Sequence, residues 1–461
     1  MTNIRLLSAI ICVIMASNAY SRPSWSDSLR QVSPLMSAPA DSSRALAILR
    51  TRLTALLTAK AYRASQVSAC VVDLSNGRTL FDLNGSTPLT PASTTKLFST
   101  AAYFTLAGKG ASVQTEVRTD GSLANDGTLQ GNLYLIGNGD AFLSTTDLEY
   151  LADRLSAMGV RRITGSIFGD GSRFDDVADR SRYSGDGEHV QPLPPIRPLI
   201  VNDGMVSVIV SAARNGRVSA QTVPSSTCFV VNITGGGTSR GKRGRRSRCS
   251  INASTRPDGT MVFTIAGSPG AGRSFTKIFS VSNPALAAAS IFRSRLTSGG
   301  VSVEGGAAER TAPPTATVLR TFRRPFADLA SVVNKRSHNY YAEHVFMMTG
   351  SLCGEYRHTA ERAKRAMVEF LDSLHVPALG CRFNDGSGLS RRNLSSAVTQ
   401  ARLLRAIARQ PWGPEYRATL SVAGRDGTLR RRMVGTAAEN NCVGKTGTLR
   451  NVSALSGYVR T

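Results

Sequence analysis

The chain has 461 residues, of which 41% are apolar and 19% are charged. This is the composition of a soluble globular protein of roughly two to four domains, and it excludes a chain dominated by low-complexity sequence. The net charge of +25 favours an anionic partner, such as nucleic acid, a membrane surface or an acidic polymer.

The N-terminus has the pattern of a secretory signal peptide. Arg5 precedes an apolar run over residues 6–15, and residues 17–19 provide a site for signal peptidase. The run is too short to cross a membrane as a helix, and no later run is long and apolar enough. We therefore predict a signal peptide over residues 1–19 and export to the periplasm without a transmembrane anchor. An uncleaved N-terminal anchor is the alternative, and export in either form argues against a nucleic-acid partner.

The cysteines suggest disulfides rather than a metal site. Apart from Cys12 in the apolar run, the chain has an even set in an oxidising compartment: Cys70, Cys228, Cys249, Cys353, Cys381 and Cys442. The sequence leaves the pairing open, with Cys228–Cys249 as the first local guess and Cys353–Cys381 as the second. Neither the cysteines nor the histidines have metal-ligand spacing, so we expect no metal and no other cofactor.

In chain order, the predicted secondary structure changes twice, from mixed to mainly β and then to mainly helical. Leucines at helical spacing predict a helix over residues 43–61, and two β-type runs follow at 67–72 and 78–81. A helix over residues 93–108 comes next. Residues 109–282 alternate between short β-type runs and turns, interrupted by one amphipathic helix at 147–158. Helices return from residue 283, and residues 442–461 predict a final pair of strands.

One basic run stands out in the β-rich part, at residues 240–248 between Cys228 and Cys249. It is either a solvated loop tip or a patch that binds an anionic polymer. It has no interleaved aromatic residues on which bases could stack, which again disfavours nucleic acid.

The stretch around Ser93 has the pattern of a nucleophile at the start of a helix. Pro91 and Ala92 precede it, and Ser93 and Lys96 lie three residues apart, so both face the same side of a helix. A hydroxyl at the positive end of the helix dipole, with an amine beside it, suits nucleophilic attack through an oxyanion intermediate. Ser-x-x-Lys is a common pattern by chance, however, and Ser274 to Lys277 has the same spacing.

Two further motifs distinguish these matches. Ser337-His338-Asn339 precedes a predicted helix, and Lys445-Thr446-Gly447-Thr448 begins the final β hairpin. Ser250-Ile251-Asn252 also matches Ser-x-Asn. The ordered set of Ser-x-x-Lys, Ser-x-Asn and Lys-Thr-Gly is typical of β-lactamases and penicillin-binding proteins.

With these motifs in this order, the chain resembles the low-molecular-mass penicillin-binding proteins of the D-alanyl-D-alanine carboxypeptidase/endopeptidase family, peptidase family S13. The long separation of Ser93 from Ser337 is similar to this family, which inserts extra domains there. The resemblance runs from about residue 43 to the end. Further family-like segments are residues 135–140, 199–204, 283–286, 385–391 and 423–429.

The resemblance implies an α+β fold with a penicillin-binding transpeptidase-like domain, an antiparallel sheet with helices on both faces. We expect this catalytic domain to comprise residues 20–108 and 284–461, and residues 109–283 to form an inserted mainly-β region of two subdomains.

The resemblance also implies a role for each motif residue. Ser93 would attack the carbonyl of a D-Ala-D-Ala bond in peptidoglycan stem peptides, Lys96 would accept its proton, and Ser337 would return a proton to the leaving amine. Asn339 would bind the peptide backbone. Lys445 and Thr446 would hold the terminal carboxylate, and Gly447 would also belong to the substrate-binding strand. The backbone N–H groups of Ser93 and Thr448 would form the oxyanion hole. The same serine would be acylated by β-lactam inhibitors.

Two departures from the family pattern bear on the fold. His338 stands where the family often has aspartate, but that side chain takes no part in the implied chemistry. After the strand that ends the sequence, the family continues with another strand and a helix, so we expect a C-terminally short catalytic domain and an unpaired sheet edge. Either the sequence is truncated, or the helix region at 43–61 covers the gap, or stability is reduced.

Two other functions remain open from the sequence. A β-lactamase shares the acylation step, although the chain has no recognisable glutamate-based deacylation loop. A non-catalytic or weakly active penicillin-binding cell-wall protein is the alternative from another class.

Overall fold

The computed structural model describes residues 9–17, 42–175, 179–186, 193–234, 249–354 and 358–460. Contacts divide the chain into two compact units. Unit 1 comprises Met1–Ser112, Asp176–Ile196 and Pro325–Thr461, and unit 2 comprises Val113–Asp175 and Arg197–Arg324. Within the described residues, no helix is both long and apolar enough to cross a membrane. The basic run at 240–248 and the predicted signal-peptide cleavage site after residue 19 lie outside these residues.

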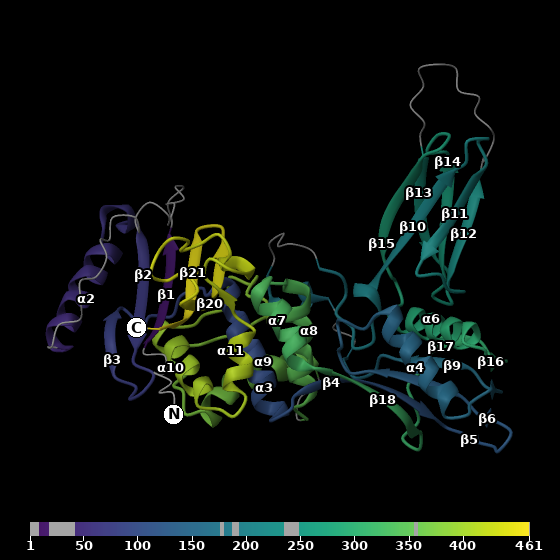
Figure 1. Ribbon diagram of the computed structural model, residues 1–461, viewed down its shortest axis with the longest axis horizontal. Coiled ribbons are helices and arrows are strands. Elements are labelled where there is room, and N and C mark those ends of the chain that lie inside the picture. Colours follow the sequence, from purple (N-terminus) through teal and green to yellow (C-terminus); the bar gives the residue numbers. More distant parts are fainter. Residues whose placement is uncertain are drawn as a thin grey trace. The chain divides into compact units, whose positions relative to one another are not determined.

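Unit 1 is built on one six-stranded sheet (Figure 1). Its neighbouring strands are antiparallel throughout. The tight turn between the two strands at the end of the chain uses Asn451 at φ 61°, a left-handed conformation that asparagine tolerates. The strand order is β19 (Ser421–Val422), β20 (Cys442–Leu449), β21 (Val452–Val459), β1 (Ala9–Ser17), β2 (Ser65–Val72) and β3 (Thr79–Leu83).

Strand β1 comes from the run predicted as the core of a signal peptide. Its backbone pairs with β2 from Ile10 opposite Val72 onward, and with β21 from Ala9 opposite Val459 onward. Because β1 pairs along β21, that strand is not the unpaired edge that we expected. The signal peptide stays a prediction, and its cleavage would remove β1 from the middle of the sheet.

The helices of unit 1 pack around a buried central helix, α3 (Thr95–Ala107). Every residue of α3 from Thr95 to Phe104 is buried, and the helix contacts α7, α8 and α9. Helix α10 packs against β1, β2 and β21. Phe104 stacks on Trp412 at 5.2 Å between ring centroids, which ties α3 to the start of α11. The other helices are α2 (Ser42–Leu57), α5 (Arg180–Ser184), α7 (Phe326–Lys335), α8 (Asn339–Ser351), α9 (Thr359–Ser373), α10 (Ala397–Ala408) and α11 (Gly413–Ala418).

Unit 2 is mainly β, as predicted, and its described residues form four sheets. A five-stranded sheet has the order β17-β9-β7-β4-β18, and a four-stranded sheet has the order β16-β8-β6-β5. Two three-stranded sheets have the orders β11-β10-β15 and β12-β14-β13. The strands are β4 (Ser112–Thr119), β5 (Ser122–Leu123), β6 (Thr128–Gln130), β7 (Leu133–Gly137), β8 (Arg162–Ile163), β9 (Ile167–Asp170), β10 (Met205–Ala212), β11 (Val218–Val223), β12 (Phe229–Thr234), β13 (Cys249–Thr255), β14 (Met261–Gly267), β15 (Ser274–Ser280), β16 (Ser302–Val303), β17 (Ala307–Glu309) and β18 (Thr317–Pro325).

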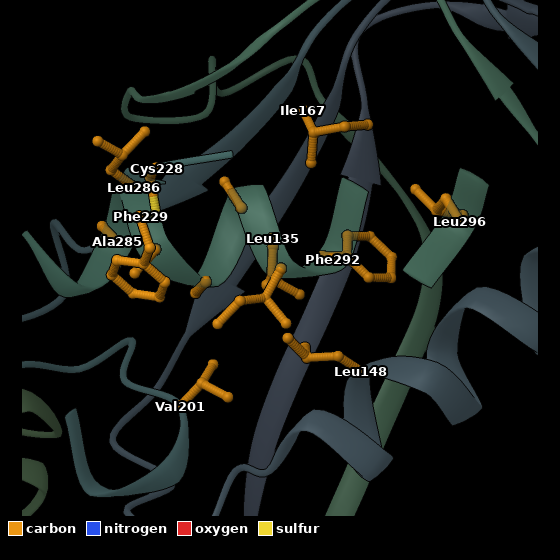
Figure 2. Close-up of a cluster of buried hydrophobic side chains, with 14 of the residues drawn as sticks. Leu135, Leu148, Ile167, Val201, Cys228, Phe229, Ala285, Leu286, Phe292 and Leu296 are labelled. Carbon is orange, nitrogen blue, oxygen red and sulfur yellow. The ribbon is translucent and has the colours of Figure 1, made fainter. Parts of the chain in front are cut away.

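Two helices complete unit 2 and share its core. The predicted amphipathic helix is α4 (Thr145–Ala157), which begins with a capping box between Ser144 and Asp147. Helix α6 (Pro284–Ser298) contacts α4, β9 and β17. Figure 2 shows the resulting cluster, in which Leu286, Phe292 and Leu296 of α6 lie among Leu135, Leu148 and Ile167.

The boundary between the units differs from the prediction at two places. We expected the catalytic part to resume at residue 284, but residues up to 324 belong to unit 2 because α6 buries its apolar side chains in the core of that unit. Residues 176–196, which we expected in the inserted region, belong instead to unit 1.

The predicted disulfides are absent among the six cysteines from Cys70 to Cys442, which are all free. The Cys228–Cys249 guess is wrong. Cys228 directly precedes β12, which starts opposite Met261, whereas Cys249 is opposite Gly267 at the far end of the same strand β14. Six strand positions separate the two ends by roughly 20 Å, far beyond the reach of a disulfide. Cys353 and Cys381 are also unpaired.

Candidate active site

Ser93 lies in a short 3₁₀ turn, η2 (Ala92–Thr94), that leads directly into α3. Ala92 adopts φ 49°, a left-handed conformation that is unusual for a residue with a side chain. Gly388 packs so closely here that a Cβ on it would lie 1.9 Å from the Ala92 carbonyl oxygen. The backbone before Ser93 is thus held in an uncommon conformation, as is frequent at functional sites.

Lys96 follows one turn later, and its side chain is completely buried. Its Nζ donates to Ser93 Oγ at 3.0 Å, to Asn339 Oδ1 at 2.8 Å and to the Ser387 carbonyl oxygen at 2.5 Å. Burial lowers the pKa of Lys96 to about 7, and the carboxylates of Asp385 and Glu343 oppose that shift. An amine with this pKa can accept the serine proton near neutral pH.

A second buried lysine, Lys445, contacts the serine of the Ser-x-Asn motif, Ser337. Ser337 lies between α7 and α8 with φ 56°, another left-handed residue. Lys445 Nζ on β20 donates to Ser337 Oγ at 2.9 Å and to the Thr446 carbonyl oxygen at 2.7 Å. Burial lowers the pKa of Lys445 well below its usual value, and the charge of Lys96 adds to that shift.

Strand β20 lies directly against the turn that carries Ser93. A Cβ on Gly447 would lie 2.6 Å from the Pro91 carbonyl oxygen and 3.2 Å from the Ser93 backbone nitrogen, so only glycine fits. Thr446 Oγ1 donates to Thr428 Oγ1 at 2.8 Å, and the Thr448 side chain is exposed. The backbone of Lys-Thr-Gly-Thr and the backbone of Ser93 therefore border one site.

The middle residue of Ser-x-Asn has a structural role here. His338 is the N-cap of α8, and its Nδ1 accepts a hydrogen bond from the Tyr341 backbone N–H at 3.4 Å. Its ring stacks on Tyr341 with 4.0 Å between centroids. Asn339, the first residue of α8, contacts Lys96 through its side-chain oxygen, a contact that the sequence did not predict.

The chance matches lie elsewhere, in unit 2. Ser274 and Lys277 are on the exposed strand β15 rather than on a helix, and Lys277 Nζ donates to the Ile251 carbonyl oxygen. Ser250 is on strand β13. Neither serine has the buried lysine that Ser93 and Ser337 each contact.

Sequence reasoning missed a set of residues behind Lys96. Ser387 supplies a carbonyl acceptor, and Glu343, Asp385 and Arg180 form a buried charged cluster next to it. The sequence could have drawn attention to Glu343, because it is the one acidic residue in the mostly apolar helix α8. Arg180 carried no such signal. Across the described part of the chain, no group of three or more His, Cys, Asp or Glu side chains could hold a metal ion.

Residues 49–461 match the family described as D-Ala-D-Ala carboxypeptidase 3 (S13). The chain belongs to the S13 peptidase family. A D-alanyl-D-alanine carboxypeptidase of Actinomadura sp. (strain R39) is 32% identical over 446 residues, which covers 92% of this chain and 80% of the relative. The D-alanyl-D-alanine carboxypeptidase DacB of Haemophilus influenzae is 24% identical, with 87% and 84% covered.

The fold agrees with this membership. The crystal structure of penicillin binding protein 4 (dacB) from Haemophilus influenzae matches with a TM-score of 0.60 at 21% identity, covering 84% of this chain and 88% of that one. The predicted family is confirmed, as is the predicted α+β penicillin-binding fold with inserted domains. This S13 member is a serine-type D-Ala-D-Ala carboxypeptidase/endopeptidase.

Proposed function

We propose that Ser93 is the nucleophile of this peptidase and forms an acyl-enzyme with the stem peptides of peptidoglycan. The observation that carries the proposal is the fully buried Lys96 amine 3.0 Å from Ser93 Oγ, next to a second buried lysine on Ser337 Oγ. A buried amine with a lowered pKa beside a hydroxyl is the arrangement that activates a serine.

The proposed acylation moves one proton through the site. Ser93 Oγ attacks the carbonyl carbon of the D-Ala-D-Ala bond and gives its proton to Lys96 Nζ. The oxyanion accepts hydrogen bonds from the backbone N–H groups of Ser93 and Thr448. The C–N bond then breaks, Ser337 Oγ donates a proton to the leaving D-alanine amine, and Ser337 takes up the proton held by Lys96, which is then neutral again. Water attacks the ester carbonyl and gives one proton to Lys96. The ester C–O bond breaks, and Lys96 returns that proton to Ser93 Oγ.

The remaining motif residues hold the substrate in this proposal. Lys445 and the Thr446 hydroxyl bind the terminal carboxylate, and Asn339 binds the peptide backbone beside Lys96. Gly447 lets β20 approach the Ser93 turn closely enough for both parts of the oxyanion hole to meet.

We further propose that penicillins acylate the same serine and that the enzyme works in the periplasm. A structure of the Haemophilus influenzae protein is a complex with a β-lactam. Export is supported by Arg5 and the apolar run that follows it.

The test combines two substrates with two variants. Purified protein is incubated with fluorescent penicillin and, separately, with a peptide ending in D-Ala-D-Ala. Stable labelling together with D-alanine release supports the proposal. Rapid penicillin turnover would indicate a β-lactamase, and labelling without D-alanine release would indicate a non-catalytic binding protein. Ser93→Ala should abolish both signals and Ser274→Ala neither; the reverse result would contradict the assignment.

A further inference from the structure

A buried cluster of four charged residues lies behind Lys96, wholly within unit 1. Arg180 Nη2 on α5 is 2.7 Å from Asp385 Oδ2 and 2.6 Å from Asp186 Oδ2, and Arg180 Nε is 3.8 Å from Glu343 Oε1 on α8. Burying these charges costs stability that apolar residues of the same size would not. The side chains of Arg180 and Asp186 are 8% and 9% exposed, and the carboxylates of Glu343 and Asp385 are fully buried.

Both carboxylates bind the backbone of one loop, residues 385–390. Glu343 accepts hydrogen bonds from the N–H groups of Ser387 at 2.9 Å and Gly386 at 3.3 Å. Asp385 accepts from the N–H groups of Gly388 and Ser390, both at 2.8 Å. Four backbone N–H groups of this loop, those of residues 386, 387, 388 and 390, therefore cannot rotate away without taking a hydrogen bond from a buried carboxylate.

Glu343 has further donors that favour its ionised form. Tyr183 OH donates to Glu343 Oε2 at 2.9 Å. Burial and the nearby charge of Asp385 raise the pKa of Glu343 to about 7, and Arg180, Ser387 and Tyr183 oppose that shift. The carboxylate is thus the form that the surrounding donors stabilise.

This loop touches the catalytic machinery at two points. The Ser387 carbonyl oxygen accepts from Lys96 Nζ at 2.5 Å, and Gly388 packs on the Ala92 carbonyl beside Ser93. With Ser93 Oγ and Asn339 Oδ1, the Ser387 carbonyl completes three acceptors around Lys96 Nζ. Together these acceptors fix the direction of the Lys96 side-chain amine. The position of one of them, the Ser387 carbonyl oxygen, depends on the conformation of the loop.

We propose that Glu343, with Asp385 and Arg180, is a positioning residue that holds the Ser387 carbonyl so that Lys96 Nζ points at Ser93 Oγ. The inference rests on the proposed role of Ser93 and Lys96 and goes beyond it. Glu343 touches neither the substrate nor the reacting atoms, and acts through the loop.

The experiment compares Glu343→Gln with a matched disruption in unit 2. Asp140 is 2% exposed and binds Arg324 Nε at 3.0 Å, so Asp140→Asn weakens a similar buried ion pair within unit 2. For each variant we would measure thermal unfolding, the rate constant of acylation by fluorescent penicillin between pH 5.5 and 9, and KM for the D-Ala-D-Ala peptide.

We expect Glu343→Gln to lower the maximal acylation rate by about 10- to 100-fold, because small displacements of a catalytic group have effects of this size. KM should stay within about twofold, since Lys445 and Thr446 are untouched. The charged groups that face Lys96 are Glu343, Asp385 and Lys445. Removing one negative charge favours the neutral amine, so the acid limb of the profile should move to lower pH.

Asp140→Asn should keep the wild-type rate and profile at temperatures where it is folded. Equal rates for Glu343→Gln and wild type, an unmoved acid limb, or an equal loss in Asp140→Asn would overturn the inference.

If Glu343→Gln does not fold, Tyr183→Phe removes one hydrogen bond to Glu343 and should lower the acylation rate by roughly threefold. An unchanged rate would overturn the inference. Failure of the proposed function is distinct, because wild type itself would then not be labelled at Ser93.

Discussion

At the residue scale, the site depends on two lysines buried without a carboxylate in direct contact. Lys96 and Lys445 are both fully buried, and each contacts a serine hydroxyl. Burial disfavours the charged form of each amine and lowers both pKa values. For Lys96 the result is an amine with a pKa of about 7, which can act as a base near neutral pH.

The first prediction concerns the pH dependence of acylation. In the proposed mechanism Lys96 accepts the Ser93 proton only as the neutral amine, and its pKa is about 7. The rate of acylation by fluorescent penicillin should therefore be low at pH 5.5 and rise through an acid limb centred near pH 7. A rate that falls as pH increases through this range would contradict the role of Lys96 as the base.

Most residues of the candidate site could be predicted from the sequence, but the groups that hold Lys96 in position could not. Ser93, Lys96, Ser337 and Lys445 occur in short motifs whose spacing is fixed by local structure. The Ser387 carbonyl belongs to the backbone, and backbone acceptors leave no mark in residue identity. Arg180 reaches Asp385 across 205 positions of chain, which no local pattern indicates.

At the element scale, the close approach of β20 to η2 brings the backbone of residues 445–448 next to Ser93. Gly447→Ala would place a methyl group 2.6 Å from the Pro91 carbonyl oxygen and push the strand away from Ser93. We expect a loss of about 1–3 kcal/mol in unfolding free energy and at least about tenfold slower acylation.

Gly306→Ala is the control for this prediction. A Cβ on Gly306, in unit 2, would meet nothing within 4 Å, and its φ is not left-handed. It should leave acylation unchanged, measured with the same fluorescent penicillin. Wild-type acylation by Gly447→Ala would show that the strand need not lie so close.

The pairing of β1 leads to a second prediction at this scale. A chain that begins at residue 20 lacks β1, and the ladders of β2 and β21 then lose their shared partner. We expect unit 1 to lose more than about 3 kcal/mol of unfolding free energy, because many backbone groups lose hydrogen bonds. Urea unfolding of this chain, beside one lacking only residues 1–8, measures the difference. Equal midpoints would mean that β1 contributes nothing to the sheet.

Hydrophobic patterns predicted local elements better than their partners in the fold. The helix at 147–158 and the mainly-β texture after residue 109 follow from periodicity, and both are present. A continuous apolar run such as residues 6–15 fits a signal peptide and a central strand equally, so periodicity does not separate them. The boundary at residue 324 depends on where α6 buries its side chains, which is a tertiary property.

At the scale of the whole molecule, the net charge of +25 is the property most relevant to the anionic cell wall. We expect binding to isolated peptidoglycan to weaken strongly between about 0.05 and 0.5 M salt, because screening shortens the range of charge interactions. Co-sedimentation of the protein with peptidoglycan over this salt range measures the binding. The Ser93→Ala variant is included to separate charge attraction from acylation. Salt-independent binding would indicate recognition by shape and hydrogen bonds instead.

The most direct test of the central claim is to locate the covalent acyl group. Trypsin cuts after Arg78, Lys96, Arg273 and Lys277, so residues 79–96 and 274–277 form separate peptides. After reaction with penicillin, mass spectrometry should find the adduct on the 79–96 peptide at Ser93, and Ser93→Ala should remove it. An adduct on the 274–277 peptide, or on any peptide of the Ser93→Ala protein, would contradict the account.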